Sequence, residues 1–190
     1  MRKSNLERKT KETQIKLELN LDGSGNYDIN TPIILFNHML STFVKHSNID
    51  LKLDAIGDSA HHIIEDTAIA LAKAFDKALG DKMSIERFGE ALIPMDESLI
   101  QIALDLGGRS YYIMDGNFKR LSLDDLAIED ILHFLETFAN NLKINLHIKI
   151  LYGKNDHHKL EAVFKALAIS FKRAIKINEK TTIPSTKGVL

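Results

Sequence analysis

A histidine-rich motif occurs twice in this chain, and this repeat restricts the possible folds more than any other feature. The segment GDSAHHIIE at residues 57–65 recurs 96 residues later as GKNDHHKLE at residues 153–161. A further histidine stands upstream of each copy, His38 in the first and His133 in the second. Six of the 8 histidines belong to this pattern. Self-similarity over such a spacing indicates a chain built from two related halves.

Hydrophobic periodicity gives a coarse secondary structure for each half. Alternating polar and apolar residues predict strands at residues 13–20, 49–55, 99–106, 110–113 and 145–151. Apolar residues at helical spacing predict helices at residues 33–44, 61–79, 125–140 and 157–177. The LDGSG sequence of residues 21–25 is typical of a hairpin turn, and Gly80 is placed to end a helix.

The order strand, strand, helix, strand, helix is therefore expected twice. This order favours an α+β fold of two duplicated halves, with the helices on one face of each sheet. We assign the halves to about residues 1–90 and 91–190. Because no linker separates them, we treat residues 1–190 as a single domain.

The HHxxE motif is suited to binding metal ions. Residues four apart share one face of a helix, whereas adjacent residues diverge by about 100°. Each of two neighbouring histidines is thus better placed to serve a different ion. Two motifs with their upstream histidines offer eight ligands, His38, His61, His62, Glu65, His133, His157, His158 and Glu161.

Eight nitrogen and oxygen ligands suit two octahedral-type sites with open positions. Imidazole and carboxylate together fit Mn, Fe, Co, Ni or Zn. The chain has no cysteine, which excludes thiolate sites, iron–sulfur clusters and disulfides. Asp66 follows the first motif but has Ala162 as its counterpart, so we expect a solvated carboxylate or an outer partner of a ligand.

Charge and hydropathy exclude several classes of partner. Lys and Arg number 25 against 26 Asp and Glu, which opposes a general nucleic-acid-binding function. No apolar stretch is long enough for a secretory signal or a membrane span. We therefore expect a cytoplasmic protein that binds neither nucleic acid nor a membrane.

The C-terminal segment, residues 182–190, combines a proline, hydroxyl groups and a cation. Ser185, Thr186 and Lys187 with nearby backbone N–H groups could bind a phosphate. A frayed terminus is the alternative interpretation. Arg87, Arg109 and Lys165 could complete such an anion site, although each alone is more often a surface charge.

Eight segments together resemble a known enzyme family. They are RKTKET at 8–13, LDGSG at 21–25, FNHML at 36–40, HHIIEDT at 61–67, RFG at 87–89, DLGGR at 105–109, HHKLEAVFKA at 157–166 and PSTKGVL at 184–190. With these motifs the chain is similar, over nearly its whole length, to the imidazoleglycerol-phosphate dehydratases of histidine biosynthesis.

The resemblance implies a fold like the second domain of ribosomal protein S5, and a homo-oligomeric shell of about 24 subunits. It also implies active sites between subunits, each holding two Mn²⁺ ions. One ion would be bound by His61, His133, His157 and Glu161. The other would be bound by His38, His62, Glu65 and His158. The positions that match phosphate and substrate contacts are Arg87, Arg109, Lys165, Ser185, Thr186 and Lys187.

The implied reaction is that of a hydro-lyase. It converts D-erythro-imidazole glycerol phosphate to imidazole acetol phosphate, and two metal ions on the substrate ring would stabilise an imidazolate. Glu12 is the candidate for proton transfer at the side chain. The implied catalytic set is Glu12, His38, His62, Glu65 and His158.

Two positions depart from the family pattern. Asn37 stands where the family usually has Asp, which excludes a base there, and Thr42 stands where Gln is common. A metal-stapled oligomeric scaffold without chemistry and an S5-type RNA-binding protein are the alternative functions. The phosphate-type tail and Glu12 argue against the scaffold, and the near-neutral charge argues against RNA binding.

Overall fold

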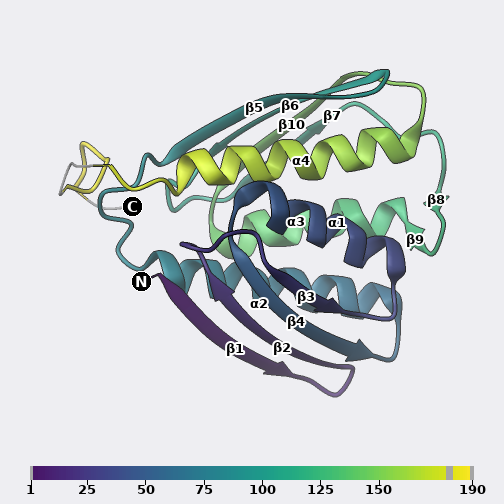
Figure 1. Cartoon of the computed structure of the whole chain (residues 1–190), viewed down its shortest axis with the longest axis horizontal. Coiled ribbons are helices and arrows are strands. Elements are labelled where there is room, and N and C mark those ends of the chain that lie inside the picture. The colour runs from purple at the N-terminus through teal and green to yellow at the C-terminus, as the bar shows by residue number, and fades with distance from the viewer. Residues whose placement is uncertain (1, 179–181, 189–190) are drawn as a thin grey trace.

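Two four-stranded sheets and four long helices make up the protein in this computed structural model, which describes residues 2–178 and 182–188 (Figure 1). The first half comprises β1 (Lys3–Lys9), β2 (Thr13–Asn20), β3 (Tyr27–Asn30), α1 (Ile34–Ser47), β4 (Asp50–Gly57) and α2 (Ala60–Leu79). The second half comprises β5 (Phe88–Met95), β6 (Ser98–Asp105), β7 (Tyr111–Asp115), β8 (Ser122–Leu123), β9 (Leu126–Ala127), α3 (Ile128–Leu142), β10 (Asn145–Tyr152) and α4 (Asp156–Ala174).

The two sheets have the same topology. The strand order is β1-β2-β4-β3 in the first and β5-β6-β10-β7 in the second. In each sheet only the last pair, β3 with β4 and β7 with β10, is parallel. The predicted α+β fold of two sheet-plus-helix halves is confirmed.

The helices lie between the two sheets (Figure 1). Helix α2 packs on β1 and β2, and α4 packs on β5 and β6. Helices of one half also pack on those of the other, α2 on α3 and α1 on α4. The aromatic rings of Phe43, Phe75, Phe138 and Phe171 contact one another in this layer. The hydrophobic core therefore joins the halves through their helices.

Several details differ from the predicted elements. The turn after β2 is not a hairpin, because the next strand, β3, pairs with β4 and not with β2. The first strand of each half, β1 or β5, was not predicted, and neither was the short pair β8 and β9. Three strands of the first half therefore precede α1, and five of the second half precede α3. Helix α3 begins at Ile128 instead of residue 125, and α4 ends at Ala174 instead of residue 177.

Side chains that cap the helices fix the start of each histidine motif. Ser59 caps α2 by accepting a hydrogen bond from the His62 backbone N–H, and Asn155 caps α4 through the His157 N–H. Asp125, predicted to be helical, instead accepts the backbone N–H groups of Ile34 and Leu35 at the start of α1, at 2.5 and 3.0 Å. Both HHxxE motifs thus begin in the first turn of a helix.

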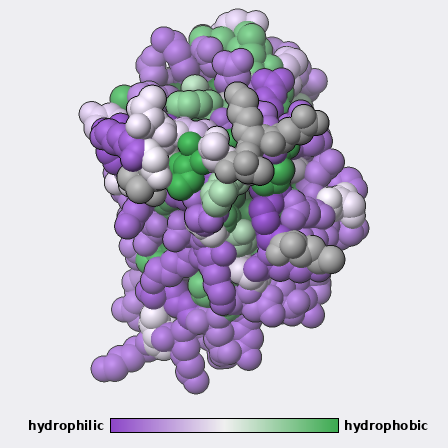
Figure 2. Space-filling model, turned by 90° about the vertical axis from the view of Figure 1, so that its left-hand side faces the viewer, coloured by the Kyte–Doolittle hydropathy of each residue, from purple (hydrophilic) through white to green (hydrophobic). Residues whose placement is uncertain are grey.

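The outer faces of the two sheets differ in polarity. Exposed residues of the first sheet are largely charged, among them Lys3, Glu7, Lys16, Glu18 and Lys52. Exposed residues of the second sheet include Phe88, Leu92, Tyr111, Ile113 and Tyr152. Figure 2 shows the end that carries the termini, where the lower part is hydrophilic and hydrophobic residues gather in the upper part. Within residues 2–178 and 182–188, no helix is both long and apolar enough to cross a membrane.

Candidate metal centre

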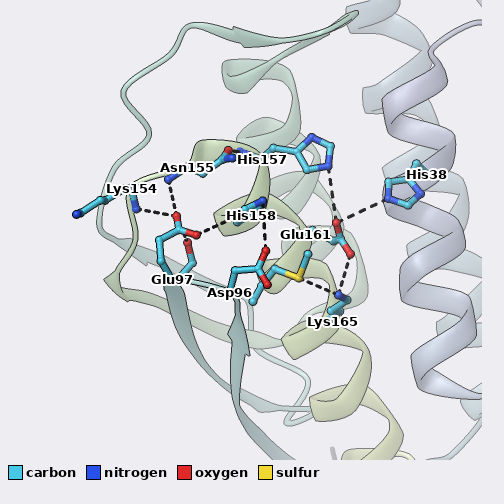
Figure 3. Close-up of polar contacts among 11 residues, drawn as sticks. His38, Asp96, Glu97, Lys154, Asn155, His157, His158, Glu161 and Lys165 are labelled. Atoms are coloured by element: carbon cyan, nitrogen blue, oxygen red, sulfur yellow. Dashed lines mark hydrogen bonds and ion pairs between the residues drawn. The ribbon is translucent and has the colours of Figure 1, made fainter.

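A first group of potential metal ligands, the α1/α4 cluster, consists of His38, His157 and Glu161 (Figure 3). His157 and Glu161 share one face of α4, as residues four apart must. His38 reaches them from α1, which packs on α4. Glu161 Oε2 lies 3.9 Å from His38 Nε2 and 3.7 Å from His157 Nε2. The three potential ligand atoms lie within 4.8 Å of one another.

A second group, the α2/α3 cluster, consists of His61, Glu65 and His133. His61 and Glu65 share one face of α2, and His133 comes from α3. His133 Nε2 lies 3.2 Å from Glu65 Oε1, and the His61 and His133 rings stack with centroids 5.3 Å apart. Asp130 Oδ1 lies 2.7 Å from His61 Nδ1, which leaves Nε2 of that ring available to a ligand.

Each cluster combines residues from both repeats, because the helices of one half pack on those of the other. The resemblance placed Glu65 with His38, and His157 and Glu161 with His61, with the ligands of one site drawn from neighbouring chains. Within one chain, helix packing places Glu65 beside His61 and His133, and it groups His38 with the α4 residues. The predicted ligand sets, which need neighbouring copies, stay a prediction.

The composition and exposure of both clusters fit a divalent metal ion. Two imidazoles and one carboxylate are ligands that Mn, Fe, Co, Ni and Zn accept. The His38 and His61 side chains remain 52% and 51% exposed. A metal ion bound here would therefore keep open positions, which chemistry requires and a closed structural site lacks.

The second histidine of each motif lies outside these clusters. His62 Nδ1 is 2.7 Å from Asp58 Oδ1, and His158 Nδ1 is 2.7 Å from Glu97 Oε2. These hydrogen bonds raise the pKa of both histidines above their usual range. The pKa of Glu97 is held well below its usual range by His158 and by backbone N–H groups.

Lys165, predicted to contact substrate, lies beside the α1/α4 cluster. Its Nζ is 2.7 Å from Glu161 Oε1 and 3.2 Å from the Met95 sulfur (Figure 3). Burial alone would raise the pKa of Glu161, but the hydrogen bond and charge of Lys165 outweigh it, so that the pKa is lowered. Glu161 is thus held ionised, as a metal ligand must be.

Glu12 lies at the turn between β1 and β2, at the same end of the molecule as the histidines. Its backbone carbonyl accepts the N–H of Asp58, and its charge contributes to the raised pKa of His62. Within residues 2–178 and 182–188 its carboxylate makes no hydrogen bond or ion pair, and it is exposed. Its role in proton transfer stays a prediction.

The predicted phosphate-binding residues Arg87, Ser185, Thr186 and Lys187 lie at the opposite end of α4. The Arg87 backbone N–H donates to the carbonyl of Ala174, the last residue of that helix. His157 lies in the first turn of α4, about 26 Å from Ala174 at the usual rise of a helix. Within this chain the tail therefore does not reach the histidines.

Arg87 ties the tail to the second sheet. Its guanidinium donates to both Asp105 oxygens, at 2.6 and 2.9 Å, and to the Pro184 carbonyl at 2.8 Å. Arg109 is exposed in the loop between β6 and β7. Ser185 Oγ accepts the backbone N–H of Lys187 at 3.2 Å, and the Lys187 side chain is exposed. The last two residues of the predicted tail, 189 and 190, lie outside the described residues.

Three further residues singled out in the sequence have well-defined surroundings. Asp66 is not solvated: it is buried and paired with Arg8, 2.7 Å away, and it accepts a hydrogen bond from Thr13. Asn37 exchanges hydrogen bonds with Thr31 before α1, so its side chain orders that turn. Thr42 is buried in α1.

Sequence reasoning missed the three carboxylates that hold the histidine rings, Asp58, Glu97 and Asp130. Asp58 precedes His62 by four residues, a spacing that could have revealed it. Glu97 and Asp130 are 61 and 69 residues from their histidines, and no local pattern marks such pairs.

Comparison with known proteins gives consistent matches. The family described as "Imidazoleglycerol-phosphate dehydratase" matches residues 31–171. Proteins named imidazoleglycerol-phosphate dehydratase from Methanosarcina mazei and Chloroherpeton thalassium are 53% and 50% identical to the chain. The first match covers 100% of both chains, and the second covers 100% of this chain and 98% of the relative.

Two solved structures with the same description resemble the fold. The protein from Staphylococcus aureus aligns with a TM-score of 0.85 at 29% identity, covering 93% of this chain and 99% of its own. The protein from Pyrococcus furiosus aligns with a TM-score of 0.86 at 35% identity, covering 97% of this chain and 100% of its own.

Proposed function

The chain belongs to the imidazoleglycerol-phosphate dehydratase family and is a hydro-lyase of histidine biosynthesis, and we propose that it performs this dehydration with two Mn²⁺ ions. The substrate is imidazole glycerol phosphate and the product imidazole acetol phosphate. The observation that carries the proposal is the pair of three-ligand clusters, one between α1 and α4 and one between α2 and α3. The alternative of a scaffold without chemistry is not favoured by this family membership.

The clusters supply three ligands to each ion. When bound, the ions supply Lewis acidity that favours negative charge on the substrate imidazole ring. His62 and His158 supply further ligands to clusters of neighbouring copies. This proposal is supported by the carboxylate on Nδ1 of each ring, which leaves Nε2 without a hydrogen bond among the described residues.

Glu12 moves the proton at the glycerol side chain of the substrate. Its carboxylate is exposed, lacks a hydrogen-bond partner among the described residues and lies near His62. A group that removes or returns a proton needs such freedom. Lys165 contacts the substrate beside the α1/α4 cluster, and the support for this role is its position 2.7 Å from Glu161.

The phosphate is held by a different copy of the chain from the one that supplies the clusters. The tail and Arg87 lie about 26 Å from the α1/α4 cluster along α4. A small phosphate ester cannot span that distance. The active site therefore lies between subunits, with Ser185, Thr186, Lys187 and Arg109 on the phosphate.

The outer face of the second sheet supports this association. Phe88, Leu92, Tyr111, Ile113 and Tyr152 expose an apolar surface that monomeric proteins usually cover. This surface is our ground for proposing a homo-oligomer, and the resemblance to the family implies a shell of about 24 subunits. We place this assembly in the cytoplasm, because a charged phosphate ester does not cross a lipid bilayer unaided.

Metal removal and reconstitution test the role of the clusters. Protein stripped with a chelator should lose dehydratase activity, and Mn²⁺ should restore it. Glu161→Gln and Glu65→Gln should each lower the Mn²⁺ content and the turnover, whereas Glu18→Gln, on the outer face of the first sheet, should change neither. Full turnover in metal-free protein would refute the metal-dependent mechanism.

Mixing two inactive variants tests the shared site. His61→Ala damages a cluster, and Lys187→Ala damages the phosphate end. If each site takes its cluster and its tail from two different chains, hybrids assembled from equal amounts should regain roughly a quarter of the activity. If one chain supplies both parts, the mixture stays inactive.

A further inference from the structure

Two glutamates occupy equivalent turns in the two repeats, Glu12 between β1 and β2 and Glu97 between β5 and β6. Thr13 pairs with Gly57 in the first sheet. In the second, the Ser98 hydroxyl lies 2.4 Å from where a Cβ on Gly153 would be. Because the two glycines are repeat counterparts, the residues just before Thr13 and Ser98 are counterparts too.

The Glu97 carboxylate is fully engaged (Figure 3). Its Oε1 accepts the backbone N–H groups of Lys154 and Asn155, at 3.0 and 2.6 Å, and the Ser98 hydroxyl at 3.2 Å. Its Oε2 lies 2.7 Å from His158 Nδ1. The carboxylate thereby links the β5–β6 turn to the start of α4.

The first repeat holds its histidine in another way. His62 Nδ1 is bound by Asp58, four residues upstream on the same segment. The counterpart of Asp58 in the second repeat is Lys154, which has no carboxylate to offer. Asp58 therefore takes the place in the first repeat that Glu97 takes in the second, and Glu12 is left without a histidine partner.

We propose that Glu97 and Asp58 are positioning residues, which hold His158 and His62 with the proton on Nδ1 and leave Nε2 free, so that Glu12 remains available for proton transfer. The assignment of metal ions to Nε2 rests on the proposed function. The ring orientation and the position of the proton do not depend on it.

The chemistry of the pair determines which nitrogen carries the proton. An ionised carboxylate only accepts hydrogen bonds, so the neutral imidazole must donate from Nδ1 and keep its lone pair on Nε2. The acid nearest that lone pair on His158 is Asp96, whose Oδ2 is 3.6 Å from Nε2, beyond hydrogen-bond distance. The Asp96 side chain is 70% exposed, so it can yield to a ligand.

The test exchanges the acceptor for an isosteric donor. In Glu97→Gln the amide oxygen can still accept the N–H groups of Lys154 and Asn155, while the NH₂ group faces Nδ1. His158 should then move its proton to Nε2. The tautomer is read by ¹⁵N solid-state NMR of histidine-labelled, metal-free protein at about pH 9, where imidazoles are neutral. The His158 signal is assigned by its loss in His158→Gln.

Mn²⁺ affinity gives the second readout. Loss of the group that orients a ligand typically costs about 10–100-fold in metal affinity, and we expect a loss of that size in Glu97→Gln. Asp96→Asn, the matched control at the other side of the ring, should keep both the tautomer and the affinity. An unchanged tautomer in Glu97→Gln, or an affinity within about twofold of wild type, would overturn the proposal.

Asp58→Asn repeats the test at a position where substitution should not unfold the protein, because the Asp58 side chain is 56% exposed. It should change the tautomer of His62 in the same way, and an unchanged tautomer would again contradict the proposal. Wild-type protein that binds no Mn²⁺ would refute the proposed function. In that case the tautomer measurements still decide whether Glu97 and Asp58 position their histidines.

Discussion

A buried ion pair next to the second histidine motif gives a quantitative test of the packing. Asp156 Oδ1 lies 2.7 Å from Lys159 Nζ, and the side chains are only 2% and 3% exposed. Asp156 Oδ2 also accepts the backbone N–H groups of Lys119 and Arg120, at 2.7 and 2.8 Å. Lys159 in turn donates to the Asn117 carbonyl at 3.1 Å. The pair therefore ties the loop before β8 to the first turn of α4.

Replacing Asp156 with Ala should be strongly destabilising. It leaves the buried Lys159 ammonium without its counter-ion and two backbone N–H groups without an acceptor. Breaking a buried pair by removing one partner costs about 3–5 kcal/mol. For a chain of this size, about 2–4 °C per kcal/mol converts this to a fall in Tm of roughly 6–20 °C.

The first repeat contains an apolar version of the same site. The counterparts of Asp156 and Lys159 are Ala60 and Ile63. The double variant Asp156→Ala/Lys159→Ile removes both charges, and such apolar replacements are often neutral or stabilising. We expect the double variant to be more stable than Asp156→Ala, because it removes the uncompensated charge. The two loop amides that lose their acceptor still cost about 1–3 kcal/mol each.

Urea unfolding of metal-free protein, followed by circular dichroism, measures both variants. A chelator is present throughout, so that metal binding does not contribute to the difference in unfolding free energy between the variants. If Asp156→Ala loses less than about 1 kcal/mol, or if the double variant is no more stable than the single one, the reasoning from an uncompensated buried charge is wrong.

Three further predictions concern pH, capping and cooperativity. The raised pKa values of His62 and His158 mean that protons compete with metal already above pH 6.5, the ordinary value, so Mn²⁺ content after dialysis should fall as the pH drops through that range. The stability of metal-free protein should depend on pH in the opposite way. The two histidine–carboxylate pairs stabilise the fold below pH 6.5, and this stabilisation is lost as the pH rises through the raised pKa values. Urea titrations at several pH values will show the change in the free energy of unfolding. Asp125→Ala should cost about 1 kcal/mol in the same assay, because it uncaps α1. Residues 1–190 should unfold in a single transition by circular dichroism and calorimetry, because the helices of both halves share one core.

Six of the eight ligands predicted from the sequence lie in the two clusters. Helical geometry alone places His61 above Glu65, and His157 above Glu161, because residues four apart share a face. Which helix faces which is a tertiary property, set by α1 packing on α4 and α2 on α3. For that reason the grouping of the ligands within one chain could not be read from the sequence.

The missed strands have a local explanation. The inward face of β1 offers Ser4 and Leu6, too few apolar residues for a clear alternation. Strand β5 contains Gly89 and Pro94, which weaken the strand pattern of the sequence. Both are edge strands whose place in the sheet depends on pairing with the next strand, β2 or β6. Glu97 was missed for the same reason, because it lies in the turn after an unrecognised strand.

The arrangement of the clusters links metal binding to the packing of the two halves. Each cluster takes one histidine from one half and a His–Glu pair from the other, at the contacts of α1 with α4 and of α2 with α3. An ion bound there restrains two helices that are otherwise joined by apolar contacts. Neither half alone holds a complete cluster, since the helix that carries the third ligand belongs to its counterpart. Both halves of the duplicated fold are thus needed to bury the shared core and to assemble each candidate metal site.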